Sequence, residues 1–222
     1  RLGLDITLHA SEWDLNFSSL NPFIKNCSLN CIKSSLKLAK ILRAKVVVVH
    51  PGKKTTKTQP REQAWQLLVD GFNELIDFAK KLKVILSVEN MAPHPKELVV
   101  TCQDIITLLE NEGLYNRGLG LTLDVAHANV CSKNVYRFMR KVKNYILHVH
   151  LSNNAGPESK VIHSPLYEGN IDIRKVLRLL KKFGYDNYIT IEGYEPKKEK
   201  CLKMLEKNAI FIRKVLSHTT IS

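Results

Sequence analysis

Ionisable side chains stand at the ends of short apolar runs throughout this sequence. The clearest run is Leu119–Asp124, which ends in a carboxylate and is followed three residues later by His127. Five other apolar runs also end in histidine or glutamate. The six terminal residues are His9, His50, Glu89, Asp124, His150 and Glu192. Carboxylates and imidazoles hold divalent metal ions and move protons in catalysis, so these residues are the first candidates for chemistry.

The runs that carry these residues have the character of strands, and amphipathic stretches separate them. The valines of Val46–Val49 are typical of a strand buried on both faces. We expect strands at 4–9, 46–49, 84–88, 119–124, 145–151 and 188–192. The spacing of apolar residues and the capping residues Thr101, Ser132 and Asp172 predict helices between them. These helices cover 23–43, 61–83, about 101–113, 132–144, 172–184 and 197–217. No linker interrupts the pattern, so residues 1–222 are predicted to form one domain.

Six βα units in succession predict an α/β protein with a parallel sheet covered by helices. Sites in barrels and in doubly wound sheets lie at the carboxyl ends of the strands, where all six candidates fall. The first strand is not followed by a glycine-rich phosphate-binding segment, which favours a (β/α) TIM-type barrel. In a closed barrel the six side chains meet at one mouth. Three carboxylates and three imidazoles there favour Zn²⁺, Mn²⁺, Co²⁺ or Mg²⁺ as the cofactor.

Each candidate also has a structural explanation. His9 and His50 could be ordinary strand-end residues, and a Pro-Gly turn follows His50. Asp124 could cap the helix that follows it. Glu89 and Glu192 could pair with lysines.

Three further histidines are less constrained. His148 lies two residues before His150 on the same strand, one layer deeper, and is interpreted either as a residue that supports the metal ligands or as a core histidine. His127 and His163 are left open between substrate binding, a further metal site and neither.

The net charge of +13 comes from 34 Lys and Arg against 21 Asp and Glu. It indicates either a polyanionic partner or a lysine-rich surface spread over amphipathic helices. No apolar run approaches the ~18 residues of a membrane span, so a membrane protein is not expected. Five cysteines without a CxxC pair favour a reducing, cytoplasmic setting.

Several segments together resemble the xylose-isomerase-like TIM-barrel superfamily. They are His50-Pro51-Gly52, Val88-Glu89-Asn90, Leu123–His127, His150–Asn153, Leu166–Asp172 and Thr190-Ile191-Glu192. That superfamily includes sugar and sugar-phosphate isomerases and epimerases, and the endonuclease IV group of abasic-site nucleases. The resemblance covers essentially the whole chain, but it does not choose between these branches.

The resemblance implies that Glu89, Asp124, His150 and Glu192 hold a shared metal ion. In the epimerase branch, Glu89 and Glu192 also exchange protons with the substrate, and His127 contacts a substrate oxygen. The other expected substrate contacts are His163, Asn90 and Trp13.

In the nuclease branch, His9, His50 and Glu89 would hold a second metal ion, and His127 a third together with an Asp-x-His pair. Here that pair reads Val161-Ile162-His163, which lacks the aspartate. Trp13 also departs from the spacing of the expected tyrosine. Asn154 stands where sugar-branch members often carry aspartate.

The family barrel has eight strands, and this chain supplies six. The first two βα units, about 50–60 residues, are therefore expected to be absent from it. Three explanations of the missing units stay open. The sequence is truncated, a second chain fills the gap, or the protein is a shortened variant.

The preferred function is that of a metal-dependent isomerase or epimerase of a small sugar or sugar phosphate. A homo-oligomer is one expected state of the protein. The alternatives are an endonuclease IV-like phosphodiesterase acting on abasic DNA and a non-catalytic metal-binding relic of the fold.

Overall fold

The computed structural model describes residues 3–132, 134–195 and 197–217. The chain divides into two compact units, residues 1–122 and 123–222. The division falls within one strand, β4 (Leu119–Asp124). Each unit is described by itself.

The described part of the first unit contains three further strands, which pair in parallel and in chain order. They are β1 (Leu8–His9), β2 (Val47–Val49) and β3 (Leu86–Glu89). The register pairs His9 with Val48 and Glu89 with Thr122. Since parallel strands end at the same edge of a sheet, His9 and Glu89 are presented at one edge.

The predicted strand at 4–9 is wrong in its extent, because only Leu8 and His9 are strand residues. Strand β1 pairs with β2, and Lys45 N donates a hydrogen bond to Ile6 O at 2.8 Å just before this ladder. Residues 4–7 therefore do not complete a ladder.

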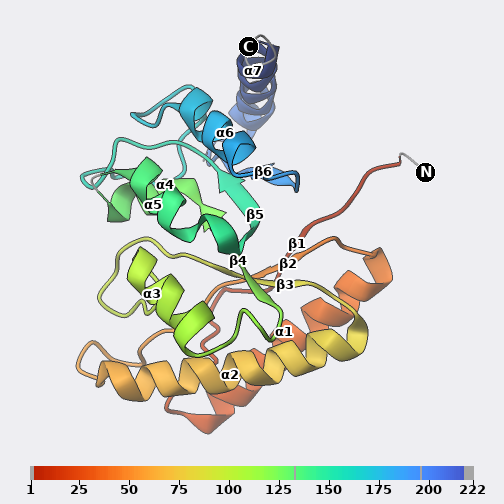
Figure 1. The fold of residues 1–222 in the computed structure, drawn as a ribbon, viewed down its shortest axis with the longest axis vertical. Helices are drawn as coiled ribbons and strands as arrows, with labels where there is room; N and C mark the ends of the chain where they lie inside the picture. Colours follow the sequence, from red (N-terminus) through yellow and green to blue (C-terminus); the bar gives the residue numbers. More distant parts are fainter. Residues whose placement is uncertain (1–2, 133, 196, 218–222) are drawn as a thin grey trace. The chain divides into compact units, whose positions relative to one another are not determined.

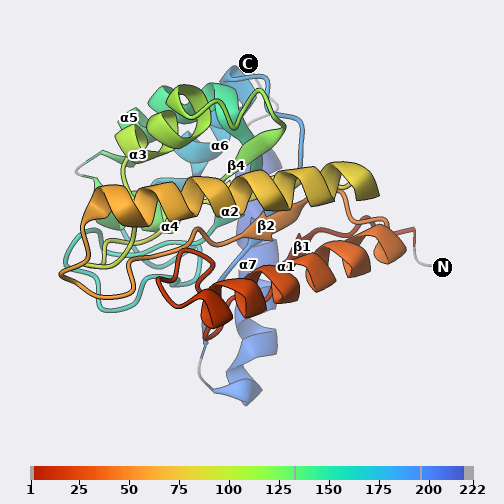
Figure 2. The same ribbon diagram turned by 90° about the horizontal axis from the view of Figure 1, so that it is seen from below.

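Helices α1 (Pro22–Leu42) and α2 (Arg61–Leu82) lie side by side in this unit (Figure 2). Asn21 caps α1 by accepting a hydrogen bond from Phe23 N at 3.0 Å, and a proline follows the cap. Leu36 of α1 and Leu68 and Phe72 of α2 are fully buried. The two helices thus supply much of the apolar core of the first unit.

The predicted helix at 101–113 is present in two parts. Helix α3 (Cys102–Ile106) is followed by the π-helical stretch η1 (Thr107–Asn111). The predicted cap is confirmed, because Thr101 Oγ1 accepts from Asp104 N at 3.2 Å and Asp104 Oδ2 accepts from Thr101 N at 2.7 Å. The widened turn is a feature that helical periodicity does not reveal.

After β4, the described residues of the second unit form two strands and several helices (Figure 1). They are α4 (Val125–Cys131), α5 (Val135–Val142), the 3-10 turn η2 (Lys143–Tyr145), β5 (Ile146–Leu151), α6 (Ile173–Lys182), β6 (Ile189–Ile191) and α7 (Lys198–Ser217). Strands β5 and β6 pair in parallel, with His150 opposite Thr190. Asp172 caps α6 as predicted, since its Oδ1 accepts from Lys175 N at 3.0 Å.

Sequence reasoning missed helix α4 and misplaced the start of α5. Helix α4 begins immediately after Asp124, and Asn134 rather than Ser132 caps α5. The first five residues of α4, 125–129, are all buried, so this segment has no solvent-exposed face and its sequence shows no helical stripe. Ser132 instead ends α4.

In the described part of the chain, none of the helices combines the length and the apolar content needed to cross a bilayer.

Candidate metal and active site

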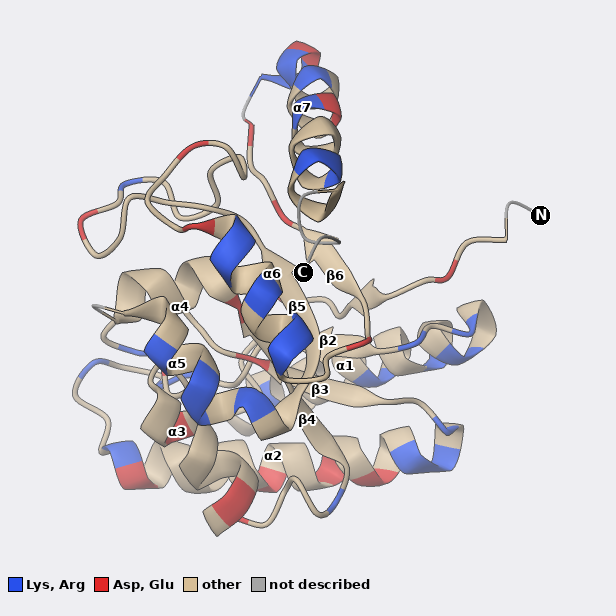
Figure 3. Ribbon diagram, turned by 45° about the horizontal axis from the view of Figure 1, so that its top comes forward, with Lys and Arg blue, Asp and Glu red and all other residues tan. Residues whose placement is uncertain are grey.

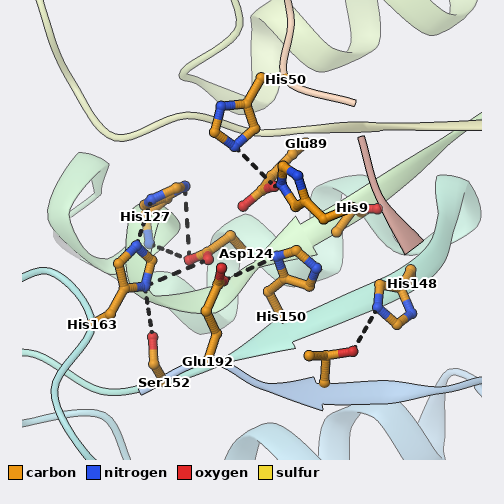
Figure 4. Close-up of polar contacts among 12 residues, drawn as sticks. His9, His50, Glu89, Asp124, His127, His148, His150, Ser152, His163 and Glu192 are labelled. Carbon is orange, nitrogen blue, oxygen red and sulfur yellow. Dashed lines mark hydrogen bonds and ion pairs between the residues drawn. The ribbon is translucent and has the colours of Figure 1, made fainter. Parts of the chain in front are cut away.

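In the first unit, two imidazoles converge on one carboxylate oxygen. His9 Nε2 and His50 Nε2 each lie 3.4 Å from Glu89 Oε2 (Figure 4). The Glu89 side chain is 1% exposed, whereas those of His9 and His50 are 31% and 30% exposed. Together the three residues offer ligand atoms within 4.8 Å of one another. This is a donor set that could hold a divalent ion.

Glu12 completes this cluster, and sequence reasoning missed it. Its Oε2 lies 2.8 Å from His50 Nδ1, and its Oε1 accepts a hydrogen bond from the Trp13 indole at 2.9 Å. His50 therefore uses Nδ1 toward Glu12 and Nε2 toward Glu89. A carboxylate that holds one imidazole nitrogen fixes the ring and leaves the other nitrogen directed at an ion. The only sequence signal was that Glu12 follows His9 by three residues.

The same contacts shift the acidities of His50 and Glu12. Burial alone would lower the pKa of His50, but the hydrogen bonds to Glu12 and Glu89 outweigh it and raise that pKa to about 10. The hydrogen bond from His50 lowers the pKa of Glu12 to about 2. The pKa of His9 is also raised, because its contacts with Glu89 and Ala10 outweigh burial.

We therefore expect the His50 imidazole of the metal-free protein to stay protonated until about pH 10. Because this folded-state pKa lies above the ordinary 6.5, the stability that it contributes is complete below about pH 6.5 and is lost as the pH rises to about 10. Glu12→Gln should lower the pKa of His50, whereas Asp14→Asn, which removes an equal charge two residues away, should not. An NMR titration of the imidazole checks this. A wild-type His50 that titrates near pH 6.5 would contradict it.

In the second unit, Asp124, His150 and Glu192 offer ligand atoms within 4.8 Å of one another. His150 Nδ1 lies 3.0 Å from Glu192 Oε2 (Figure 4). Asp124 ends β4, His150 lies near the end of β5 and Glu192 follows β6, so the three residues come from successive strand ends. The strand-end prediction thus brings these three together.

Asp124 also caps the helix that follows it, which was the structural explanation considered for this residue. Its Oδ1 accepts a hydrogen bond from His127 N at 2.6 Å and caps α4. A carboxylate has a second oxygen, and Asp124 Oδ2 lies 3.9 Å from His163 Nδ1. Capping and ligation are therefore compatible, because they use different oxygens.

His127 and His163 face each other beside Asp124. Their Nε2 atoms are 3.2 Å apart, and the three residues form a further group with ligand atoms within 4.8 Å of one another. Two nitrogens bound tetrahedrally to Zn²⁺ at ~2.0–2.1 Å would lie about 3.3 Å apart, so the pair fits an ion. Val161, where the nuclease pattern has aspartate, is 49% exposed and supplies no ligand atom. Ser152 Oγ lies 3.0 Å from His163 Nδ1, a contact that sequence reasoning also missed.

The loop that carries His163 is held by buried side-chain amides. Asn154 Nδ2 donates to Ala126 O at 2.9 Å and to Ile162 O at 3.0 Å, and Asn129 Nδ2 donates to Asn154 Oδ1 at 2.7 Å. An aspartate at 154 would lack the amide donor. The departure at Asn154 is therefore explained by the anchoring of the loop that carries His163.

Gly169 belongs to the same loop and has φ +131. A Cβ there would lie 2.4 Å from Asn153 Oδ1 and 2.5 Å from Asn154 O. Gly169→Ala is expected to lower the free energy of unfolding by about 1–3 kcal/mol through backbone strain, with the clash adding to this. Gly184→Ala is the matched control, since Gly184 has φ +75 with no atom within 4 Å of a Cβ and should cost less. Urea unfolding of the two variants measures the difference; equal losses would contradict the account of the loop.

The remaining candidates are placed as follows. Trp13 is 86% exposed and is tied to Glu12, whereas Asn90 is fully buried directly after Glu89. His148 is fully buried, and its Nε2 lies 3.0 Å from Thr190 Oγ1. Of the two interpretations of His148, its burial and its contact with Thr190 favour a core histidine.

Within each unit the donor chemistry fits a divalent cation. Imidazole nitrogens and carboxylate oxygens approach one another from the ends of neighbouring strands at the spacings given above. Burying several such groups together is costly unless they are paired or share a cation.

Three relatives and one solved structure show what the chain is similar to. An uncharacterized protein of Methanocaldococcus jannaschii, MJ1311, is 30% identical over 204 residues, 87% of this chain and 66% of that protein. The fructoselysine 3-epimerase of Escherichia coli O157:H7 is 23% identical over 171 residues, 74% of this chain and 58% of that protein. A probable endonuclease 4 of Sulfurihydrogenibium is 27% identical over 122 residues, 55% of this chain and 42% of that protein.

The crystal structure of a D-tagatose 3-epimerase-like protein matches with a TM-score of 0.88 and 27% identity. The match covers 99% of this chain and 79% of that one. The chain spans less than two thirds of the length of each of the three relatives named above.

A family model described as "Xylose isomerase-like TIM barrel" matches residues 1–214. With the parallel strand pairs and the alternation of strands and helices, this match confirms the predicted α/β, TIM-type fold. The chain belongs to the xylose isomerase-like TIM barrel family.

Proposed function

We propose that this protein is a divalent-metal-dependent isomerase or epimerase of a small sugar or sugar phosphate. The observation that carries the proposal is the convergence of Asp124, His150 and Glu192 from successive strand ends. The likeness to an epimerase-like structure at 27% identity supports the choice of sugar chemistry.

Glu89 is proposed as the fourth ligand of the same centre. It ends β3, and the register pairs it with Thr122, two residues before Asp124 on the next strand. Adjacent parallel strands therefore end in Glu89 and Asp124. The proposed ion is Zn²⁺, Mn²⁺, Co²⁺ or Mg²⁺, and when bound it would polarise the carbonyl and hydroxyl oxygens of the sugar.

The chain's own carboxylates would move the proton. Glu192 and Glu89 are proposed to remove a carbon-bound proton and return one, acting as general base and general acid. The Glu192 side chain is 39% exposed, so a substrate can reach it, and His150 Nδ1 holds one of its oxygens at 3.0 Å. His127, His163, Asn90 and Trp13 are the proposed substrate contacts.

Solvent exchange tests this proposal. The metal-loaded protein is incubated in deuterated water with a panel of ketopentoses, ketohexoses and their phosphates, and carbon-bound deuterium is followed by NMR. Incorporation at the carbon next to the carbonyl, with formation of the epimer or isomer, supports the proposal. Metal-loaded protein without exchange on any member of the panel would contradict it.

A second candidate function is cleavage of abasic DNA. It is favoured by the additional ligand set of His9, His50 and Glu89, and by the partial similarity to a probable endonuclease 4. Val161 opposes this function, because valine replaces the aspartate that the nuclease pattern places beside His127 and His163. Chelator-sensitive incision of a duplex with one abasic site would promote this function. Metal-loaded protein inactive in both assays would leave a non-catalytic metal-binding protein.

A further inference from the structure

A cationic surface lies on two helices of the second unit, and the proposed function does not use it. Helices α5 and α6 contain no aspartate or glutamate. Their basic residues are all exposed and gather on neighbouring ribbons (Figure 3). They are Arg137, Arg140, Lys141, Arg174, Lys175, Arg178, Lys181 and Lys182. We call these eight residues the basic face.

The two helices adjoin, so the basic face is continuous. The Tyr136 hydroxyl of α5 accepts a hydrogen bond from Asp172 N, at the cap of α6, at 2.9 Å. Lys175 Nζ lies 4.1 Å from the centre of the Tyr136 ring. The contacts fix the starts of both helices together, which brings their cations to one surface.

The charges of the basic face are not compensated within the described second unit, where none of the eight residues forms an ion pair. The described part of the first unit differs, because lysines and arginines there pair with acids. These pairs are Lys33–Glu74, Lys45–Asp5, Arg61–Asp104 and Arg117–Asp77. Uncompensated like charges repel one another and attract an external polyanion. The +13 net charge is thus concentrated in part on one surface, rather than only spread over the helices.

The composition of the face indicates which polyanion it fits. Helices that lie in a membrane interface need large apolar side chains to insert, and α5 and α6 expose none among their described residues. A phosphodiester backbone needs only a row of cations. We propose that the basic face binds the phosphate backbone of duplex nucleic acid without reading its bases.

This binding does not depend on the proposed catalytic centre. The candidate ligands of the second unit lie at the carboxyl ends of β4, β5 and β6, whereas the basic face is on the outward surfaces of α5 and α6. His150→Gln should therefore leave nucleic-acid binding unchanged. A negative sugar-exchange assay would therefore count against the proposed function only, and a negative DNA-binding assay against the basic face only.

Fluorescence anisotropy with a labelled 20-base-pair DNA duplex, over a series of salt concentrations, tests the proposal. Each phosphate contact contributes about −0.9 to the slope of log affinity against log salt. Arg140→Gln, Arg178→Gln and Lys182→Gln combined should reduce the magnitude of the slope by up to about 2.7. The control combines Lys37→Gln, Lys40→Gln and Lys80→Gln, which remove three exposed cations from α1 and α2.

A reduced slope in the basic-face variant with an unchanged slope in the control supports the proposal. Equal reductions in both variants, or no reduction in either, overturn it. Vesicles of phosphatidylserine and phosphatidylcholine are titrated in parallel. Vesicle binding that the basic-face variant loses, without a change in DNA binding, would assign the surface to a membrane and also overturn the proposal.

Discussion

Glu192→Gln is expected to slow the exchange of carbon-bound sugar protons with solvent by about 10²–10⁴-fold, the usual contribution of a positioned general base. Glutamine keeps the shape of the side chain and an oxygen that can face an ion, but it cannot accept a proton at neutral pH. The His150 contact at 3.0 Å and the partial exposure of Glu192 place its carboxyl group where both an ion and a substrate can meet it.

The measurement is deuterium incorporation by NMR on a substrate that the wild-type protein turns over, with the metal content determined on the same sample. Glu168→Gln, an exposed glutamate of the same unit, is the matched control and should behave as wild type. If Glu192→Gln exchanges protons at the wild-type rate, Glu192 has no proton-transfer role.

His150→Ala is expected to weaken divalent-metal affinity by more than the ~10–100-fold that loss of an outer hydrogen-bond partner costs. His150 is 4% exposed and directs Nδ1 at Glu192, so its removal deletes an inward-facing donor and leaves the carboxylates of Asp124 and Glu192 less shielded from each other. Titration with Co²⁺, followed by its visible absorption, measures the affinity. His94→Gln removes an exposed imidazole in the first unit and should not change it. Equal affinities of His150→Ala and wild type would exclude His150 as a ligand.

The fold and most of the candidate ligands could be predicted because both follow local rules. Apolar runs such as Val47–Val49 and Leu119–Asp124 form strands for reasons contained in a few residues, and parallel strands present their ends at one edge. His9, His50 and Glu89 in one unit, and Asp124, His150 and Glu192 in the other, meet for that reason.

The residues that sequence reasoning missed depend on contacts between segments far apart in the chain. Glu12 acquires its role from His50, which lies on a later strand end, and Ser152 acquires its role from the loop that carries His163. Asn154 looked like a departure from a pattern, but its amide donates to two backbone carbonyls that only the folded loop brings close. Polar side chains in loops carry no periodicity, so their partners cannot be read from spacing.

Helix α4 was missed for a different reason. The first five residues of α4 are buried, so no alternation of exposed and buried positions marks a helix, and the short segment after Asp124 joins a strand directly. Asp124 therefore belongs to both elements, as the end of β4 and as the cap of α4. This double position fixes the carboxylate where the strand ends, which a flexible loop residue would not achieve.

Elemental analysis of the chain, purified without chelator and after loading with Zn²⁺, Mn²⁺ or Co²⁺, tests the proposed metal centre most directly. We expect at least about one tightly held divalent ion per chain, removed by dialysis against a chelator and largely absent from Asp124→Ala. A folded wild-type chain that retains none of these ions after loading, or an Asp124→Ala variant that retains as much as wild type, would contradict the proposed centre.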